Sequence, residues 1–277
     1  MKQGILGNWT ARIWSRFRAR PTEPGKLLNW TADNKLEIDG VSFRCTLEPA
    51  EYHTFQSTEN DFLLIKSREM IETDLKVFLE GRRARNVIDI GIWQGGSVVL
   101  LDLLLNPRKL LGIEYNPTPV PALAAYIAER KRRNVSIQYG VDQGATQDMI
   151  QILNDTFGDE PIDLVIDDAS HQYAETKRSF EAIFPRMAPG AHFIIEDWQW
   201  SIVDGMWQLD YFKDKPGLVN LVVEIAAVLA SRRDLVSEVV LLPFSVIVTR
   251  GTAPYSKVPL VLDDIASSRG AAIEPVL

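Results

Sequence analysis

Between Asn86 and Asp197, short runs of apolar residues alternate with longer segments whose apolar residues recur at helical spacing. The apolar runs predict five buried strands, with the sequences NVIDIG, KLLGIE, VSIQYG, IDLVID and AHFIIED. The segments between them predict helices around Ser97–Leu105, Val120–Arg133, Gln147–Phe157 and Ala174–Phe184. Strands that are apolar throughout and separated by helices are typical of a parallel sheet covered on both faces. We therefore predict an α/β fold with a doubly wound sheet.

The alternation changes after Asp197. A helix is expected near Leu218–Ser231, followed by two strands at about Ser237–Leu242 and Phe244–Thr249. These strands lie too close together in the sequence for a crossover helix, so they are expected to pair antiparallel at one end of the sheet. The whole is predicted to be Rossmann-like: a mostly parallel seven-stranded sheet with an antiparallel last strand.

The first part of the chain has a different pattern. An Asp39-Gly40 turn within Lys35–Leu47 predicts a small β-hairpin, and Lys66–Gly81 predicts a helix that ends at a glycine. We expect a basic amphipathic arm over 1–24, an N-terminal extension with the hairpin over 25–65, and the main domain over 66–277. Within that domain, an aromatic-rich insert at about 198–217 is expected to form a lid.

Composition limits the functions that are open. The chain has 277 residues, 46% of them hydrophobic, and a formal net charge of −7, which argues against nucleic acid as the main partner. Its single cysteine, Cys45, excludes an internal disulfide and suggests a reducing, cytoplasmic environment. No apolar run reaches the roughly 18 residues of a membrane span. The basic arm has two interpretations: a helix that contacts the inner face of a membrane or a partner, or a simple peripheral arm.

A glycine-rich turn follows the first of the five strands, in DIGIWQGGS (Asp89–Ser97). Gly91 and Gly95 allow a sharp turn and a close approach of the backbone to a ligand, and Ser97 can cap the next helix. The turn is not the GxGxxG dinucleotide motif, because Trp93 stands at the second glycine position. A purely steric role for these glycines remains the alternative.

Two acidic residues follow the next two strands. Glu114 ends the second strand, where a carboxylate can accept hydrogen bonds from both hydroxyls of a ribose. Asp142 follows the third strand, where it could accept an adenine amino group or simply cap a helix. Ligands of open α/β sheets bind beyond these carboxyl ends, so both positions are candidates for a nucleotide-type ligand.

Four carboxylates end the fourth and fifth strands: Asp167 and Asp168, then Glu196 and Asp197. Neighbouring strands lie about 4.8 Å apart, so these like charges would be crowded unless a cation compensates them. Oxygen ligands of this kind suit Mg²⁺. His171 follows Asp168 and could act as a general base near neutral pH. Either motif alone is more often a helix cap or a structural histidine; their coincidence favours a catalytic site.

At these residues the sequence resembles a known family. DLVIDDASHQYAETKRSFEAIFPRMAPGAHFIIEDWQW, together with GIWQGGS and GVDQ, resembles class I S-adenosylmethionine-dependent sugar O-methyltransferases of the mycinamicin and macrocin type and their cephalosporin-hydroxylase-like relatives. The resemblance extends over about Val87–Trp200. Ala169 and Ala191 stand where the family usually has glycine.

The resemblance implies roles for individual residues. Asp168, Glu196 and Asp197 would bind Mg²⁺, and His171 would be the base that deprotonates a sugar hydroxyl. The implied residues of the S-adenosylmethionine site are Asp89, Gly91, Gly95, Ser97, Glu114, Asp142, Gln143 and Asp167.

The expected partner is a sugar-containing small molecule or oligosaccharide, with a lipid-linked acceptor an option because of the basic arm, and we expect a homo-oligomer. The aromatic residues of Glu196–Phe212 could contact a sugar ring or pack at a lid or subunit contact. Two rival functions remain open: a nucleotide-cofactor oxidoreductase or hydroxylase, and a non-catalytic partner in a glycan or antibiotic assembly system.

Overall fold

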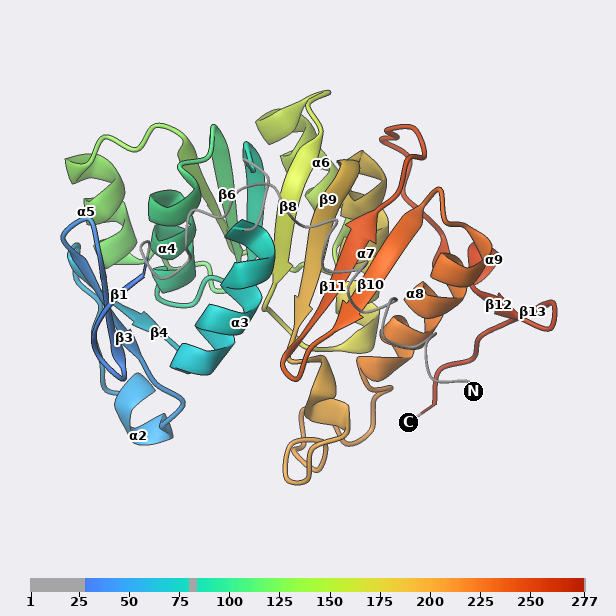
Figure 1. The fold of residues 1–277 in the computed structure, drawn as a ribbon, viewed down its shortest axis with the longest axis horizontal. Coiled ribbons are helices and arrows are strands. Elements are labelled where there is room, and N and C mark those ends of the chain that lie inside the picture. Colours follow the sequence, from blue (N-terminus) through green and yellow to red (C-terminus); the bar gives the residue numbers. More distant parts are fainter. Residues whose placement is uncertain (1–27, 80–83, 277) are drawn as a thin grey trace, which may run out of the picture. The chain divides into compact units, whose positions relative to one another are not determined.

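The computed structural model describes residues 28–79 and 84–276 (Figure 1). The predicted arm over 1–24 lies outside these residues. The described chain divides into two compact units, one with residues 28–56 and 60–79 and the other with residues 57–59 and 84–276. The helix that was predicted from Lys66 onward therefore groups with the N-terminal strands, and the main unit begins at Ala84.

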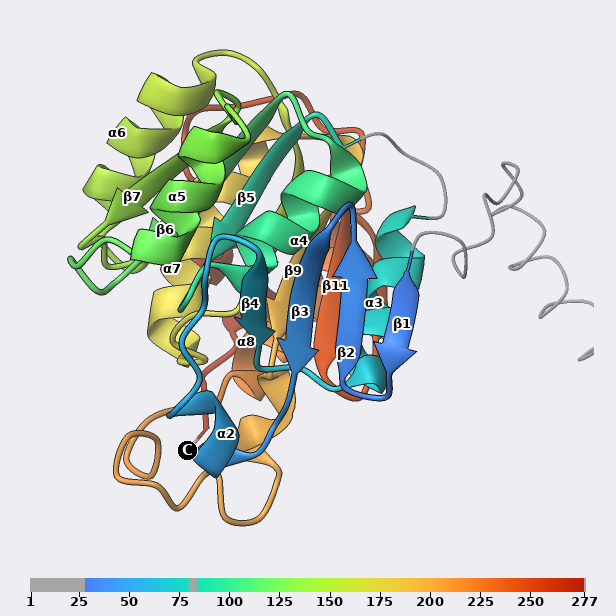
Figure 2. The ribbon, with the colours of Figure 1, turned by 90° about the vertical axis from the view of Figure 1, so that its left-hand side faces the viewer.

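The N-terminal unit contains a four-stranded sheet in the order β1-β2-β3-β4, seen face-on in Figure 2. Its elements are β1 (Asn29–Ala32), β2 (Lys35–Ile38), β3 (Val41–Cys45), α2 (Pro49–Tyr52), β4 (Asp61–Leu64) and α3 (Arg68–Leu79). The predicted hairpin is β2 and β3, and its turn residues Asp39 and Gly40 both have positive φ, at 48° and 74°. Strands β1 and β4 were not predicted. Strand β4 pairs parallel with β3 and buries Phe62 at 6.4 Å from the Phe43 ring.

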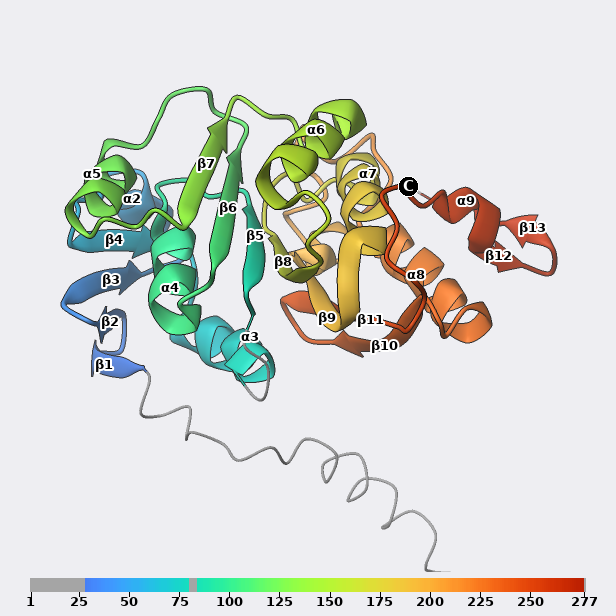
Figure 3. The same cartoon turned by 90° about the horizontal axis from the view of Figure 1, so that it is seen from above.

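The main unit contains the predicted seven-stranded sheet. Its order is β10-β11-β9-β8-β5-β6-β7, and Figure 3 shows these strands in sequence across the sheet. The strands are β5 (Asn86–Ile90), β6 (Lys109–Glu114), β7 (Val135–Tyr139), β8 (Ile162–Asp167), β9 (Met187–Glu196), β10 (Val236–Leu241) and β11 (Ser245–Arg250). Strand β11 runs antiparallel to both of its neighbours, β9 and β10, as expected for the last strand.

Helices cover both faces of this sheet. They are α4 (Gly96–Leu105), α5 (Pro121–Glu129), α6 (Thr146–Phe157), α7 (Tyr173–Ile183) and α8 (Val219–Ser231), with the short α9 (Leu262–Ile265) and the strands β12 (Ser267–Ser268) and β13 (Ala271–Ala272) near the end. A hydrophobic core cluster packs α6, α7 and α8 against one face, through residues such as Leu153, Phe180 and Ile225. In the part of the chain that is described, no helix is long and apolar enough to cross a membrane.

The sheet order creates the place for a ligand. The chain proceeds from β5 to β6 and β7 in one direction and then returns to β8 on the other side of β5. At such a switch point the connections after adjacent strands diverge and leave a crevice at the carboxyl ends. The ends of β5 and β8 are therefore the expected borders of a site.

Candidate active site

The glycine turn after β5 allows the ends of β5 and β8 to approach closely, because Gly91 has no side chain. Gly91 has a φ of +86°, and a Cβ on it would lie 2.3 Å from the backbone oxygen of Asp168. The Asp168 amide donates a hydrogen bond to the carbonyl of Ile90 at 2.9 Å. A side chain at position 91 would therefore displace the backbone that carries Asp168.

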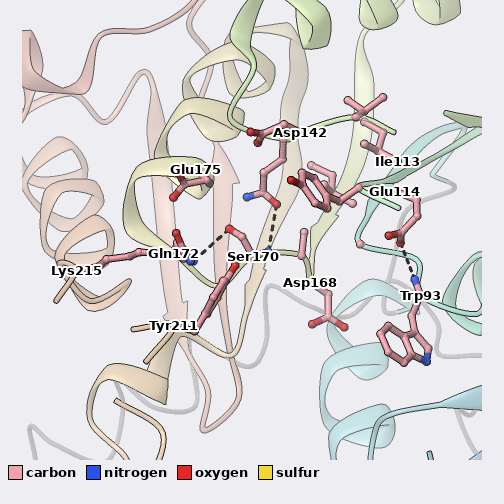
Figure 4. Close-up of a pocket in the computed structure, with 16 residues that line it drawn as sticks. Trp93, Ile113, Glu114, Asp142, Asp168, Ser170, Gln172, Glu175, Tyr211 and Lys215 are labelled. Carbon is pink, nitrogen blue, oxygen red and sulfur yellow. Dashed lines mark hydrogen bonds between the residues drawn. The ribbon is translucent and has the colours of Figure 1, made fainter. Parts of the chain in front are cut away.

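A cavity of about 480 Å³ lies at the carboxyl ends of β5, β6, β7 and β8 (Figure 4). Its size is within the usual range of small-molecule sites. Of the predicted cofactor residues, it is lined by Gly91, Glu114, Asp142 and Gln143. The remaining lining residues include Trp93, Tyr115, Asp168, Ser170, Gln172, Glu175, Tyr211 and Lys215.

Glu114 is oriented by the backbone around it. Its Oε2 accepts hydrogen bonds from the amide of Trp93 at 3.0 Å (Figure 4) and from that of Ile92 at 3.2 Å. Its Oε1 accepts one from the Asn116 amide at 2.9 Å. The carboxylate is thus held in one orientation before any ligand arrives. Oε1, which accepts one hydrogen bond, keeps a further lone pair for a hydroxyl donor, whereas both acceptor sites of Oε2 are taken by the two amides.

The loop after β7 is held by its own side chains. Asp142 accepts a hydrogen bond from the Gly144 amide at 2.8 Å. Gln143 is buried and donates a hydrogen bond to Thr176 Oγ1 at 3.2 Å, while its Oε1 accepts one from the Ser170 amide at 3.4 Å. Gln143 therefore joins this loop to the loop after β8.

Four predicted cofactor residues do not line the cavity: Asp89 is fully buried within β5, Gly95 precedes α4, Ser97 lies in that helix, and Asp167 is 2% exposed. Asp167 accepts a hydrogen bond from Ser179 Oγ at 2.8 Å. Burial raises the pKa of Asp167 to about 7, and the neighbouring Asp168 charge acts in the same direction. Its carboxyl group thus joins β8 to α7.

Asp168, His171 and Asp197 form a compact group, which we call the rim group; one ligand atom of each lies within 4.8 Å of the others. The His171 Nε2 atom is 3.8 Å from Asp168 Oδ1 and 3.9 Å from Asp197 Oδ2. Two carboxylates therefore face one imidazole ring. Three partly exposed ligand atoms in this arrangement are suited to a divalent cation.

Two residues of the rim group have a left-handed backbone, with φ of 53° at His171 and 55° at Asp197. This conformation is uncommon for residues other than glycine and costs free energy, so it persists only where the surrounding structure holds it. Asp197 lies between the end of β9 and the short 3-10 helix Trp198–Ser201. This conformation directs the Asp197 carboxylate toward His171.

Glu196, the third predicted metal ligand, ends β9 and is 5% exposed. It is not part of the three-residue group that the described residues form. The register pairs Asp167 with Ile195, so Asp168, which directly follows β8, and Glu196, the last residue of β9, come next along the chain from this pair. Its role as a ligand stays a prediction.

The aromatic-rich insert packs directly on the histidine. The ring of Trp200 lies 4.4 Å from that of His171, and Phe212 contacts Trp200 at 5.7 Å. Trp198 instead donates from its indole nitrogen to the Leu242 carbonyl at 3.0 Å and packs against the core. Trp207 is 44% exposed. The aromatic residues of the insert thus lie in different environments: against His171, against the core, or at the surface. Their sequence pattern did not distinguish these positions.

Sequence reasoning missed Trp93, Tyr115, Tyr211 and Lys215 as cavity residues. Tyr115 directly follows Glu114, and Trp93 lies in the predicted glycine turn two residues after Gly91, so both could have been found by the strand-end argument. Tyr211 and Lys215 lie far along the chain, in the insert that was expected to meet the acceptor. Only the folded structure shows that these two side chains border the same cavity as Glu114 (Figure 4).

Comparison with known proteins adds independent information. Residues 88–198 match the family model of a methyltransferase domain. The sequence resembles a rhamnosyl tetracenomycin C 2′-O-methyltransferase from Streptomyces olivaceus, with 34% identity over 139 residues that cover 46% of this chain and 33% of the relative. It also resembles the mycinamicin VI 2″-O-methyltransferase from Micromonospora griseorubida, with 51% identity over 37 residues, 13% of this chain and 9% of the relative.

The predicted resemblance to sugar O-methyltransferases is confirmed. The chain spans a third or less of the length of these two relatives. Among solved structures, the MycE methyltransferase in complex with Mg, SAH and mycinamycin VI superposes with a TM-score of 0.51 and 18% identity, over 68% of this chain and 50% of that one. This likeness confirms the fold that the strand and helix pattern predicted.

Proposed function

We propose that the main unit is an S-adenosylmethionine- and Mg²⁺-dependent O-methyltransferase that methylates a hydroxyl group of a sugar. One observation carries the proposal: Asp168 both lines the cavity at the strand ends and belongs to the rim group. A donor bound in the cavity and an acceptor bound at the rim group would therefore meet at this residue.

The cavity fits S-adenosylmethionine. Gly91 and Glu114 both line the cavity, and Glu114 presents an oriented carboxylate to the ribose hydroxyls. Asp142 and Gln143 border the nucleobase end. In this proposal Asp89, Gly95, Ser97 and Asp167 contribute by shaping the turn and the strand ends around the cavity.

The rim group fits Mg²⁺ through its carboxylates. Asp168 and Asp197 would hold the ion, with Glu196 as the third candidate ligand, and their like charges would be neutralised by it. When bound, the metal would supply a positive charge that favours deprotonation of the sugar hydroxyl, and the cofactor would supply an already activated methyl group. His171 accepts the hydroxyl proton at Nε2, the nitrogen that faces both carboxylates. Trp200 restricts the rotation of the imidazole ring.

The sugar assignment rests on two supports. Both curated relatives carry names of enzymes that methylate a hydroxyl of a sugar-bearing natural product. The insert next to the rim group offers exposed aromatic rings, such as Trp207, whose flat faces suit the apolar faces of sugars. The molecule that carries the sugar, whether a natural product, a polysaccharide or a lipid, is identified by a mass-spectrometric methyl-transfer screen of glycosides with free vicinal hydroxyls.

The test separates binding from chemistry. Calorimetry with S-adenosylhomocysteine is expected to show binding to the wild-type protein, and Glu114→Ala is expected to weaken it. In the glycoside screen, His171→Ala is expected to lower turnover about 10²–10⁴-fold, because a general base is lost, with little change in cofactor affinity. His192, whose ring contacts Thr249 at 3.3 Å in the sheet, provides the control variant His192→Gln with retained turnover.

Two results would contradict the proposal. Absence of binding of S-adenosylhomocysteine by the wild-type protein removes the cofactor assignment. Turnover that is indifferent to EDTA and to added Mg²⁺ removes the metal from the mechanism.

A further inference from the structure

Tyr211 lies in the insert between the short 3-10 helix Trp198–Ser201 and α8, yet its side chain borders the cavity. The backbone around it forms tight turns, with the Phe212 amide donating to the Leu209 carbonyl at 2.8 Å and the Lys215 amide donating to the Phe212 carbonyl at 2.9 Å. The Lys215 ammonium lies 4.6 Å from the centre of the Tyr211 ring. The tyrosine is therefore held in place although half of its surface is exposed.

The surroundings of Tyr211 identify the end of the cavity that it borders. Burial raises the pKa of Tyr211, the nearby Glu175, Tyr115 and Asp142 raise it further, and a contact with the Gln172 side chain acts in the opposite direction. Tyr115 follows β6 and Asp142 follows β7. In the proposed function Glu114 is assigned to the ribose, and Asp142 borders the nucleobase end of the cavity. Figure 4 shows Tyr211 and Lys215 on the side of the cavity opposite Glu114 and Trp93.

Tyr211 is also connected to the rim group by a series of ring contacts. Its ring lies 4.7 Å from Phe212, the Phe212 ring lies 5.7 Å from Trp200, and the Trp200 ring lies 4.4 Å from His171. The same short insert thus reaches both the cavity and the proposed base.

We propose that Tyr211 contacts the nucleobase of the bound cofactor, so that the insert 198–217 binds cofactor at one end and positions His171 at the other. This inference rests on the proposed function, because it assumes that the cavity holds S-adenosylmethionine. A flat phenol ring beside a purine provides the kind of aromatic contact that stabilises bound bases. Cofactor binding then immobilises the insert and, through Phe212 and Trp200, the imidazole of His171.

The proposal is tested by calorimetry with two probes, S-adenosylhomocysteine and 5′-methylthioadenosine, which share the nucleoside but not the amino-acid tail. Tyr211→Ala is expected to weaken binding of both about tenfold, the order expected for loss of one base–aromatic contact. Tyr211→Phe keeps the ring and is expected to stay within about threefold of the wild type. Trp207→Ala removes a similarly exposed aromatic of the insert that does not line the cavity, and is expected to leave both affinities unchanged.

Hydrogen exchange provides the second readout. S-adenosylhomocysteine is expected to slow amide exchange across 198–217 in the wild type and in Trp207→Ala, but not in Tyr211→Ala at matched occupancy. If the wild type binds both probes and Tyr211→Ala binds them equally well, this inference is wrong while the proposed function stands. The inference is also wrong if Tyr211→Ala changes only the KM of the acceptor, because Tyr211 would then belong to the acceptor site. If the wild type binds neither probe, both proposals fail.

Discussion

Two groups of polar side chains lie near the start of α7, and they differ in whether they contain a permanent cation. The rim group contains Asp168, His171 and Asp197. It therefore has two acids and a histidine, and none of the three carries a permanent positive charge. The second group, which we call the helix network, contains Tyr173, Lys177 and Glu224. Lys177 Nζ lies 3.1 Å from Glu224 Oε1, 3.0 Å from the Tyr173 hydroxyl and 2.5 Å from Asp263 in α9.

The helix network contains a permanent cation that is paired directly with its acids. Burial alone would lower the pKa of Lys177, but its hydrogen bonds to Asp263, Tyr173 and Glu224 outweigh burial and raise that pKa. Glu224 is 1% exposed and also accepts a hydrogen bond from the Tyr173 hydroxyl. The cation and its acids therefore meet within the fold, and the network needs no ligand.

The rim group is built differently. Its two carboxylates have a histidine between them, which contributes a positive charge only when protonated. Repulsion between two carboxylates held this close is unfavourable for folding. A bound cation would attract both carboxylates and offset that repulsion. The comparison teaches that the charge balance among the members of a cluster distinguishes a group that stabilises the fold from one that is suited to a cation.

The largest effect is expected from breaking the helix network. Lys177→Met keeps the apolar part of the side chain but leaves the Glu224 charge buried without its cation. Loss of one partner of a buried pair is expected to lower the free energy of unfolding by about 3–5 kcal/mol, measured by urea denaturation. The double variant Lys177→Met/Glu224→Gln removes both charges and is expected to recover most of that loss. A double variant no more stable than Lys177→Met would show that packing, not charge, explains the effect.

A smaller effect is expected when the rim group is displaced without any change in its charges. In Gly91→Ala the new Cβ would lie 2.3 Å from the Asp168 carbonyl oxygen, so the backbone beside the rim group must shift. Displacement of a reacting group by about 1 Å costs on the order of 10²-fold in turnover, measured by methyl-transfer kinetics.

Gly158 provides the matched control for this variant. It also has a positive φ, of +61°, but a Cβ on it would meet nothing within 4 Å. Gly158→Ala is therefore expected to lose some stability and to keep its turnover. An equal loss of turnover in both variants would assign the effect to general destabilisation.

The smallest effect is expected from removing one charge of the rim group. Asp197→Asn relieves repulsion with Asp168, so without divalent ions the free energy of unfolding is expected to stay equal or rise by about 1 kcal/mol. Mg²⁺ is expected to raise the melting temperature of the wild type but not of this variant. In the helix network, Asp263→Asn is expected to act in the opposite direction, because it removes a partner of Lys177. Destabilisation of both variants to the same extent, with no response to Mg²⁺, would remove the distinction between the two groups.

Much of the site could be predicted because strand ends are local features. Apolar runs that end at Ile90, Glu114 and Asp167 determine which residues reach the rim of a parallel sheet, and the rim group was predicted in this way. Asp167 shows the limit of that argument. The sequence analysis assigned both Asp167 and Asp168 to the site, but adjacent residues at a strand end point to opposite faces. Asp168 lines the cavity, whereas Asp167 accepts a hydrogen bond from Ser179.

The sequence by itself determined the parallel sheet, the glycine turn and the acids at the strand ends, because each depends on residues close together in the chain. The tertiary structure alone decided three other features. Strand β4 pairs with β3 across an intervening loop, Asp167 turns toward Ser179, and Tyr211 reaches the cavity from the insert. These features depend on contacts between distant segments, whose geometry is set by packing of the whole unit and leaves no periodic pattern in the sequence.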